Sequence, residues 1–133
     1  MCILYTSRIA YRGADRLDTT VKSGGGLGKL LAPTWVLVGG VKRHETQDRD
    51  ARWLKYRPLT HEQYTDGYYG LLRERYKAAS APFMELVQRE RLVICCYCAA
   101  SAFCHRHLAV DILSKIAAYH GLPIMCGGEL PIG

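Results

Sequence analysis

The sequence predicts an α/β protein made of a single domain, residues 1–133, with a mostly parallel sheet. The first observation is the continuous apolar run Leu92–Cys98, which is typical of a strand buried on both faces. The second is an amphipathic helix over Cys104–Tyr119 followed by a short strand over Pro123–Cys126, because this order predicts a parallel strand–helix–strand unit. The third is the length, since 133 residues make one domain of ordinary size.

The first half of the chain carries weaker signals. Cys2–Thr6 is short, apolar and rich in strand-forming residues, so we expect an opening strand there. Ser7–Lys22 has no clear periodicity and is expected to be a loop or a short helix. Trp35–Val38 predicts a second short strand, ended by two glycines, and the charged segment Lys42–Arg52 predicts a solvated turn or short helix.

Two helices are predicted in the middle of the chain. Thr60 is followed by Gln63, the pair that forms a capping box, and tyrosine and leucine residues then recur at helical spacing. We therefore expect a helix over about residues 60–78. A second helix is expected to begin at Ser80, because Pro82 falls in its first turn.

The glycine-rich segment 24–30 does not meet the requirements of a P-loop that binds nucleoside triphosphates. That motif needs a further glycine where this chain has Ser23, and a serine or threonine where it has Leu30. We therefore expect a flexible glycine loop, which could act as a lid.

The composition limits the class of protein and of partner. Hydrophobic residues make up 49% of the chain, which excludes a disordered protein. The longest apolar run is far shorter than the roughly 18 residues that cross a bilayer, so no membrane partner is expected. No basic leader of a signal peptide is evident, which favours a cytoplasmic protein. Eighteen lysines and arginines against 12 acidic residues give a net charge of +6, which favours an anionic partner, a nucleotide-like molecule or a nucleic acid.

The cysteines are clustered. Four of the six lie within the ten residues from Cys95 to Cys104, too close together for all of them to pair with one another in good geometry. In a reducing compartment such a cluster indicates a site, a metal or an apolar strand rather than a disulfide framework. Its densest part is Cys96-Tyr97-Cys98, five further residues, and then Cys104-His105-Arg106-His107. This group lies where the predicted buried strand ends and the next helix begins.

That location has chemical consequences. Backbone N–H groups at a helix N-terminus bind anions, and Arg106 adds a fixed positive charge. The same environment stabilises a thiolate, so a lowered pKa is expected for Cys104. These features predict an anion or nucleotide pocket in which Cys104, His105 and Arg106 bind or polarise a ligand.

Three other interpretations stay open. The cysteines can be small buried strand residues, with His105 as an interior histidine. Cys98, Cys104 and His107 can supply three zinc ligands, although the paired spacing of common structural zinc sites is missing. A catalytic thiol in the manner of cysteine phosphatases and rhodaneses is the third, although seven residues separate Cys98 from Arg106 and those phosphatases place about five there.

The block Leu92–Leu108, followed by a helix, a short strand and Gly128-Glu129, resembles the domain-of-unknown-function family four-eight-eight. That family has an opening strand with Tyr-Thr, a late hydrophobic strand ending in Cys, and Cys-His-Arg at the following helix. Four further segments fit a compact branch of it: Leu4–Ile9, Arg16–Thr20, Ala32–Trp35 and Tyr64–Tyr76. The resemblance implies a single three-layer, Rossmann-like α/β domain with a pocket at Cys104-His105-Arg106, and it implies no particular reaction.

Carrying this pattern over suggests further site residues. Ser7 and Arg8 are placed at the end of the first strand, beside the Cys98 loop. Asp18 is either the ion-pair partner of a neighbouring arginine or a pocket acid. Candidates for contact with a base or a ribose are Trp35, Tyr64, Tyr68 and Glu129. Core packing for the aromatic residues, and a surface carboxylate for Glu129, are the structural alternatives.

The sequence thus predicts a protein that binds a phosphate-bearing small molecule, a nucleotide or a derivative of one. Its predicted ligand-binding residues are Ser7, Arg8, Trp35, Tyr64, Tyr68, Cys98, Arg106 and Glu129. If the protein is a hydrolase or a transferase, its predicted catalytic residues are Cys104, His105 and Asp18. Two alternatives stay open, which are nucleotide sequestration without turnover and nucleic-acid association with a zinc-binding Cys/His cluster.

Overall fold

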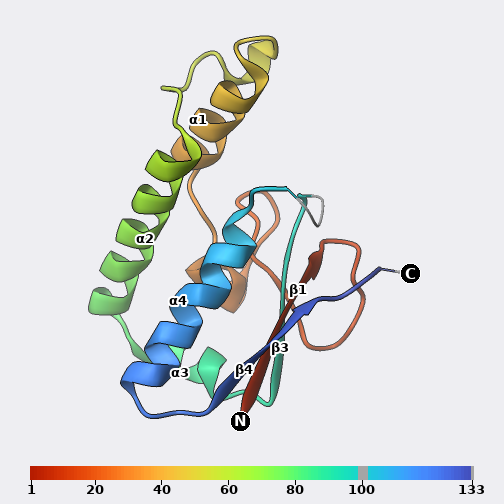
Figure 1. Ribbon diagram of the computed structural model, residues 1–133, viewed down its shortest axis with the longest axis vertical. Helices are drawn as coiled ribbons and strands as arrows, with labels where there is room; N and C mark the ends of the chain where they lie inside the picture. Colours follow the sequence, from red (N-terminus) through yellow and green to blue (C-terminus); the bar gives the residue numbers. More distant parts are fainter. Residues whose placement is uncertain (99–101, 133) are drawn as a thin grey trace.

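The computed structural model describes residues 1–98 and 102–132, which form an α/β fold around a four-stranded sheet (Figure 1). The strands are β1 (Cys2–Arg8), β2 (Arg16–Asp18), β3 (Arg91–Cys96) and β4 (Ile124–Glu129). Their order across the sheet is β2-β3-β1-β4, and every pairing is parallel. The predicted α/β class is confirmed, and the arrangement is consistent with a Rossmann-like three-layer domain.

Helices pack on the sheet and on one another. Their bounds are η1 (Gly26–Leu30), α1 (Trp35–Thr46), η2 (Ala51–Trp53), α2 (His61–Ala78), α3 (Ala81–Val87) and α4 (His105–Tyr119). Helix α4 packs across β1, β3 and β4, α2 packs against α4, and α1 lies beside α2 (Figure 1). No helix in the described part of the chain is both long enough and apolar enough to cross a membrane.

The strongest sequence signals correspond to the observed elements. The capping box at the start of α2 is complete, since Thr60 N donates to Gln63 Oε1 at 2.9 Å and Gln63 N donates to Thr60 Oγ1 at 3.1 Å. Residues 92–96 of β3 are all buried, as the continuous apolar run predicted. The β4 strand lies where a last strand was expected and continues three residues further, to Glu129.

The prediction of a strand over Trp35–Val38 is wrong, because these residues form the first turns of α1. A short apolar run does not distinguish a strand from a helix, and here Thr34 caps a helix by accepting from Leu37 N. The two glycines that follow do not end the element. A Cβ on Gly39 would come within 2.2 Å of the Tyr56 ring, so glycine serves close packing inside the helix.

Two shorter segments also differ from expectation. Residues 16–18, within the predicted loop or short helix, form β2 against β3. A strand this short, with Leu17 as its one apolar residue, leaves no periodic signal. The glycine segment is not simply a flexible loop, since it contains η1 and packs closely. A Cβ on Gly28 would lie 1.9 Å from the Asp18 carbonyl oxygen.

The parallel register brings the carboxyl ends of the strands to one edge of the sheet. Arg8 of β1 lies opposite Cys96 of β3, and Asp18 of β2 lies opposite Cys95. On the other side of β1, Thr6 lies opposite Glu129 of β4. Because α4 begins at this same edge, His105 meets Thr19 just after β2, and Arg106 meets the ends of β3 and β4 there.

Candidate functional site

Buried polar side chains gather at the carboxyl edge of the sheet. Those buried within the described residues are Thr6, Ser7, Thr19, Thr20, His105 and Arg106. Each of them has a hydrogen-bond partner, as burial of a polar group requires. Because ligands of open parallel sheets bind outside the carboxyl ends of the strands, this edge is the candidate site.

A cavity of about 410 Å³ opens at this edge, bordered by the end of β3, the start of α4 and parts of α1, η2 and α2. Its volume is in the range of small-molecule sites, about 300–1,000 Å³. The aromatic residues of its wall are Trp35, Trp53, Tyr64, Tyr97 and Phe103. The cationic residues are Lys22, Lys42 and Arg52, and the thiols are Cys96, Cys98 and Cys104. The cavity is thus mostly apolar, with charge and sulfur at defined points.

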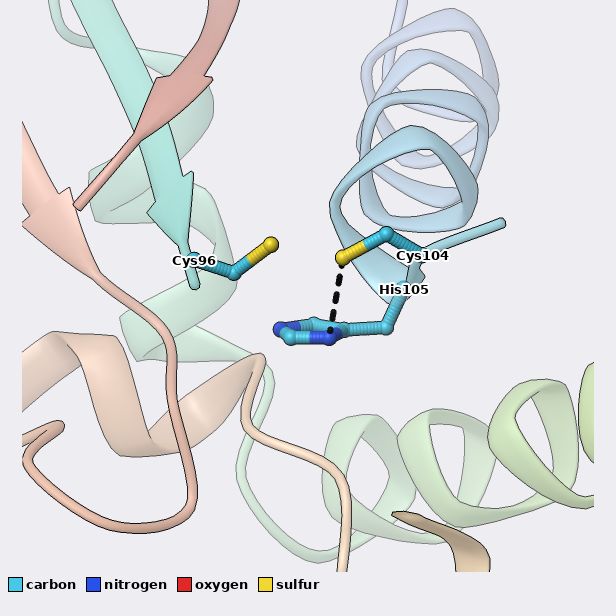
Figure 2. A group of neighbouring side chains, drawn as sticks. All are labelled: Cys96, Cys104 and His105. Carbon is cyan, nitrogen blue, oxygen red and sulfur yellow. Dashed lines mark hydrogen bonds between the residues drawn. The ribbon is translucent and has the colours of Figure 1, made fainter. Parts of the chain in front are cut away.

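His105 is held in one tautomer at the N-terminus of α4. Its Nε2 lies 2.9 Å from the Thr19 carbonyl oxygen, so this nitrogen carries the hydrogen and donates it. Nδ1 then has a free lone pair, and it lies 3.7 Å from Sγ of Cys104 (Figure 2). Burial lowers the pKa of His105 to about 4, so the imidazole is neutral at pH 7. The wall of the cavity therefore presents a neutral imidazole beside a thiol.

Three ligand atoms from this edge converge. Sγ of Cys96, Sγ of Cys104 and a ring nitrogen of His105 all lie within 4.8 Å of one another, and all three residues are buried (Figure 2). These residues lie close enough to hold a metal ion. This corrects the predicted ligand set, since His105 takes the place assigned to His107 and Cys96 joins Cys104 as a central thiol. The side chain of His107 is exposed and borders a separate hollow near Glu129.

The thiol pKa values differ from the expectation for Cys104. Hydrogen bonds with the Cys96 and Cys98 sulfurs, together with burial, raise the pKa of Cys104 instead of lowering it. The pKa of Cys98 is lowered, because the Cys104 and Cys96 thiols donate hydrogen bonds to its sulfur. Residues 99–101, part of the predicted loop between Cys98 and Cys104, lie outside the described residues. Of the thiols in this cluster, Cys98 is therefore the one that most readily loses its proton.

Arg106 does not face the cavity, which corrects its predicted role as an anchor for the ligand. Its side chain is 0% exposed, and Nη2 pairs with Glu129 Oε2 at 3.1 Å. Nη1 donates to Cys96 Sγ at 2.8 Å and to the Cys98 carbonyl at 2.9 Å. Glu129 is likewise bound to other side chains of the protein, since it also accepts a hydrogen bond from Thr6 Oγ1. Burial opposes the charge of Arg106, but the contacts with Cys96 and Glu129 outweigh it and raise its pKa. Arg106 therefore acts by holding the Cys96 sulfur, the Cys98 carbonyl and Glu129 in position.

The other predicted site residues either form hydrogen bonds within the fold or lie at the surface or on the cavity wall. Ser7 donates to the Leu130 carbonyl at 2.8 Å, and the buried Tyr68 donates to the Leu31 carbonyl at 2.7 Å. Asp18 accepts from Thr20 and Ser23; burial alone would raise its pKa, but these hydrogen bonds lower it, so it is not a proton donor at neutral pH. Arg8 is exposed at the end of β1. Trp35, Tyr64, Cys98, Cys104 and His105 are placed on the cavity wall.

Several site residues were not found by sequence reasoning. Cys96 was named in the cysteine cluster but was not assigned as a metal ligand, although strand alternation places it on the same face as Leu92 and Ile94. Lys42 and Arg52 are the ends of the charged segment that predicted a solvated turn or short helix, and Trp53 directly follows it. Thr19 carries no local signal, since its contact with His105 joins residues 86 positions apart.

Comparisons of this chain with protein-family models, with curated proteins and with solved structures find no match. The resemblance to family four-eight-eight therefore stays a prediction. What the site can do chemically follows from its own side chains.

Proposed function

We propose that the protein binds a phosphate-bearing small molecule with a flat aromatic part, a nucleotide or a nucleotide derivative, in the cavity at the carboxyl edge. The observation that carries this proposal is the presence of tryptophan rings and of a surplus of cations on one cavity wall. Cavities that bind a purely apolar ligand do not need the cations, and sites for a bare anion do not need the rings.

The aromatic part of the ligand is assigned to the two tryptophans. Trp35 begins α1 and is 44% exposed, and the half-buried Trp53 belongs to η2 on the same wall. Stacking of a base on an aromatic side chain contributes about 1–3 kcal/mol. The guanidinium carbon of Arg52 lies 5.1 Å from the centre of the Trp53 ring, so a cation already lies beside one of these rings.

The phosphate is assigned to the cations of the wall. Lys42 contacts Glu45 at a loose 3.7 Å, and Arg52 pairs with Asp50 at 2.7 Å. Lys22 is exposed and has no carboxylate partner among the described residues. With Glu45 and Asp50 counted against the three cations, the wall still keeps one positive charge, which favours an anionic group. In this proposal these side chains bind the phosphate, which is the role that the sequence suggested for Arg106.

Isothermal titration calorimetry with AMP, adenosine and inorganic phosphate tests the proposal. We expect AMP to bind more tightly than either fragment, because only AMP contacts both rings and cations. Lys22→Ala and Trp53→Ala should each raise the Kd for AMP about tenfold, equivalent to ~1.4 kcal/mol. Lys29→Ala is the matched control, since Lys29 is also exposed and pairs with no carboxylate in residues 1–98 and 102–132, but lies outside the wall. Equal affinity for AMP and adenosine would contradict the proposal.

Salt dependence separates a nucleotide from a nucleic-acid partner. A protein that contacts several phosphates of a strand loses affinity steeply as salt rises, with a slope that follows the number of contacts. Binding of one AMP should depend on salt only weakly. A single-stranded oligonucleotide that binds more tightly than AMP at low salt, with a steep slope, would favour the nucleic-acid alternative.

Turnover of the ligand stays a prediction with its own assay. Cys104 and His105 belong to the cavity wall, so a ligand bound there lies within reach of both. Chromatography of AMP after incubation with the protein tests for a hydrolase or transferase reaction. Unchanged product formation by Cys104→Ser would remove Cys104 as the nucleophile.

A further inference from the structure

The Cys/His group at the end of β3 has a chemistry that ligand binding by rings and cations does not use. We propose that Cys96, Cys104 and His105 bind a zinc ion, with Cys98 as the fourth ligand. Thiolate and imidazole donors select zinc among the common divalent ions of cells, and four of them complete a tetrahedral site. The proposal is independent of the nature of the small-molecule ligand.

The geometry of the three central ligands fits such a site. With Zn–S near 2.3 Å and Zn–N near 2.0–2.1 Å, neighbouring atoms of a tetrahedron lie about 3.5–3.8 Å apart. Cys104 Sγ and His105 Nδ1 are already 3.7 Å apart, and Cys96 Sγ lies within 4.8 Å of both ligand atoms. Figure 2 shows the two sulfurs and the ring directed toward a common point from β3 and from the start of α4. Small side-chain movements therefore suffice to close the site.

The orientation of His105 is set before any metal arrives. Its Nε2 donates to the Thr19 carbonyl at 2.9 Å, and Thr19 Oγ1 in turn donates to the Cys95 carbonyl at 3.0 Å. Metal-binding histidines commonly donate their other ring nitrogen to a carbonyl or a carboxylate, which fixes the tautomer and the ring plane. Here that contact leaves the lone pair of Nδ1 directed at the thiols.

A fixed cation supports the thiolate form of the ligands. Thiols must lose their protons to bind zinc, and a neighbouring positive charge makes this loss less costly. Nη1 of Arg106 donates to Cys96 Sγ at 2.8 Å, from a side chain that is fully buried and anchored on Glu129. The arginine thus supplies the outer hydrogen bond that a zinc thiolate needs.

Cys98 is the side chain best placed to complete the site. It follows Cys96, the last residue of β3, by two residues. Together with Cys96 and Cys104 it borders the cavity, so the metal would form part of the cavity wall. A sulfur bound to zinc is not free to attack a ligand, and zinc binding therefore excludes Cys104 as a covalent nucleophile in the loaded protein.

Metal analysis of the purified full chain, produced with zinc in the medium and dialysed, tests the proposal without any nucleotide. We expect one zinc per chain in the wild type, and its loss in Cys96→Ser and Cys104→Ser. Cys95→Ser is the matched control, because Cys95 is equally buried on the same strand but faces the other side of the sheet. Zinc far below one per chain in the wild type, or its retention in Cys104→Ser, would overturn the proposal.

Cobalt titration of the metal-free wild type keeps the test valid if the variants fold poorly. Thiolate ligation gives charge-transfer absorption in the near ultraviolet, and tetrahedral geometry gives visible ligand-field bands. Absence of both would overturn the site. For the fourth ligand, Cys98→Ser should weaken zinc binding by at least the roughly tenfold that loss of an outer-shell partner costs. Unchanged affinity in Cys98→Ser would overturn the assignment of Cys98.

Discussion

Two arginine–carboxylate pairs lie at opposite ends of the parallel sheet and differ in their exposure to water. At the amino end, Arg91 begins β3 and pairs with Asp15, and its side chain is 48% exposed. At the carboxyl end, Arg106 lies in the first turn of α4 and pairs with Glu129, and its side chain is 0% exposed. The same two functional groups therefore meet in two very different environments.

The difference shows which end of the sheet depends on its polar groups. Arg91 keeps its contact with water and lies over the Tyr5 ring, 4.5 Å from its centre, and an exposed pair of this kind contributes little to stability. Arg106 has lost its water and is stabilised by a carboxylate, a sulfur and a carbonyl together. Because a buried charge without partners is strongly destabilising, each member of this network depends on the others.

Arg106→Met removes the buried charge and is expected to have the largest effect. Glu129, the Cys96 sulfur and the Cys98 carbonyl would all lose a donor, and breaking a buried pair from one side costs about 3–5 kcal/mol. Since Glu129 is 24% exposed, water can replace part of what it loses, so we expect the lower part of that range. Urea unfolding with an unchanged m-value measures the difference.

Two further variants sharpen this result. Arg106→Lys keeps the charge without the planar fork, and it should fall between wild type and Arg106→Met. The double variant Arg106→Met with Glu129→Gln should recover part of the loss, because the carboxylate no longer lacks a cation. An Arg106→Met protein as stable as the wild type would show that the network does not hold the carboxyl edge together.

Thr19→Val tests the same edge at a neutral hydrogen bond and should have an intermediate effect. Valine keeps the shape of threonine, but the Cys95 carbonyl keeps only the Thr19 backbone N–H as a donor, at 3.1 Å, and the hydroxyl beside His105 Nε2 is gone. One hydrogen bond contributes about 0.5–1.5 kcal/mol net, so we expect a loss of stability of that size. Thr19→Ser keeps the hydroxyl and serves as the control, and equal loss in both variants would assign the effect to packing instead.

The two ends also differ in how far sequence reasoning could describe them. Strong periodic signals predicted β3, α2 and α4 close to their observed bounds, because long amphipathic or continuous apolar segments determine their own secondary structure. The segment Trp35–Val38 was assigned to a strand because a short apolar run suits both states. Its helical state depends on close contacts of glycines in α1 with Tyr56 and neighbouring residues, which are tertiary contacts.

The edge of the sheet at which the cysteines and His105 meet was predicted, but the directions of the side chains were not. Clustering of cysteines with His105 indicated the carboxyl edge, because parallel strands end together and a helix starts there. Whether a charged side chain faces a cavity or the protein interior is decided by partners far along the chain. Arg106 turns inward to meet Glu129, 23 residues later, and no local pattern reports this.

Asp15→Asn breaks the exposed pair at the amino end, and it should have the smallest effect at neutral pH. Burial alone would raise the pKa of Asp15, but hydrogen bonds from Tyr11 and Arg91 outweigh it and lower the pKa. A carboxyl whose pKa is lower in the folded state stabilises the fold above its unfolded pKa, near 3.9, and loses this contribution as pH falls through the folded value. The wild type should therefore be slightly more stable than the variant at pH 7.

The pH dependence distinguishes charge from shape at this end. Asparagine keeps the backbone contact in which Val93 N donates to the Asp15 carbonyl at 3.0 Å, so the variant removes the charge and one of the two side-chain oxygens that accept from Tyr11 and Arg91. Urea unfolding of both proteins from pH 7 to pH 3 should show their difference shrinking below about pH 4, where the Asp15 carboxyl of the unfolded wild type begins to take up a proton. A difference that stays constant over this range would assign the effect to packing. A difference as large as that for Arg106→Met would mean that exposure to water does not separate the two pairs.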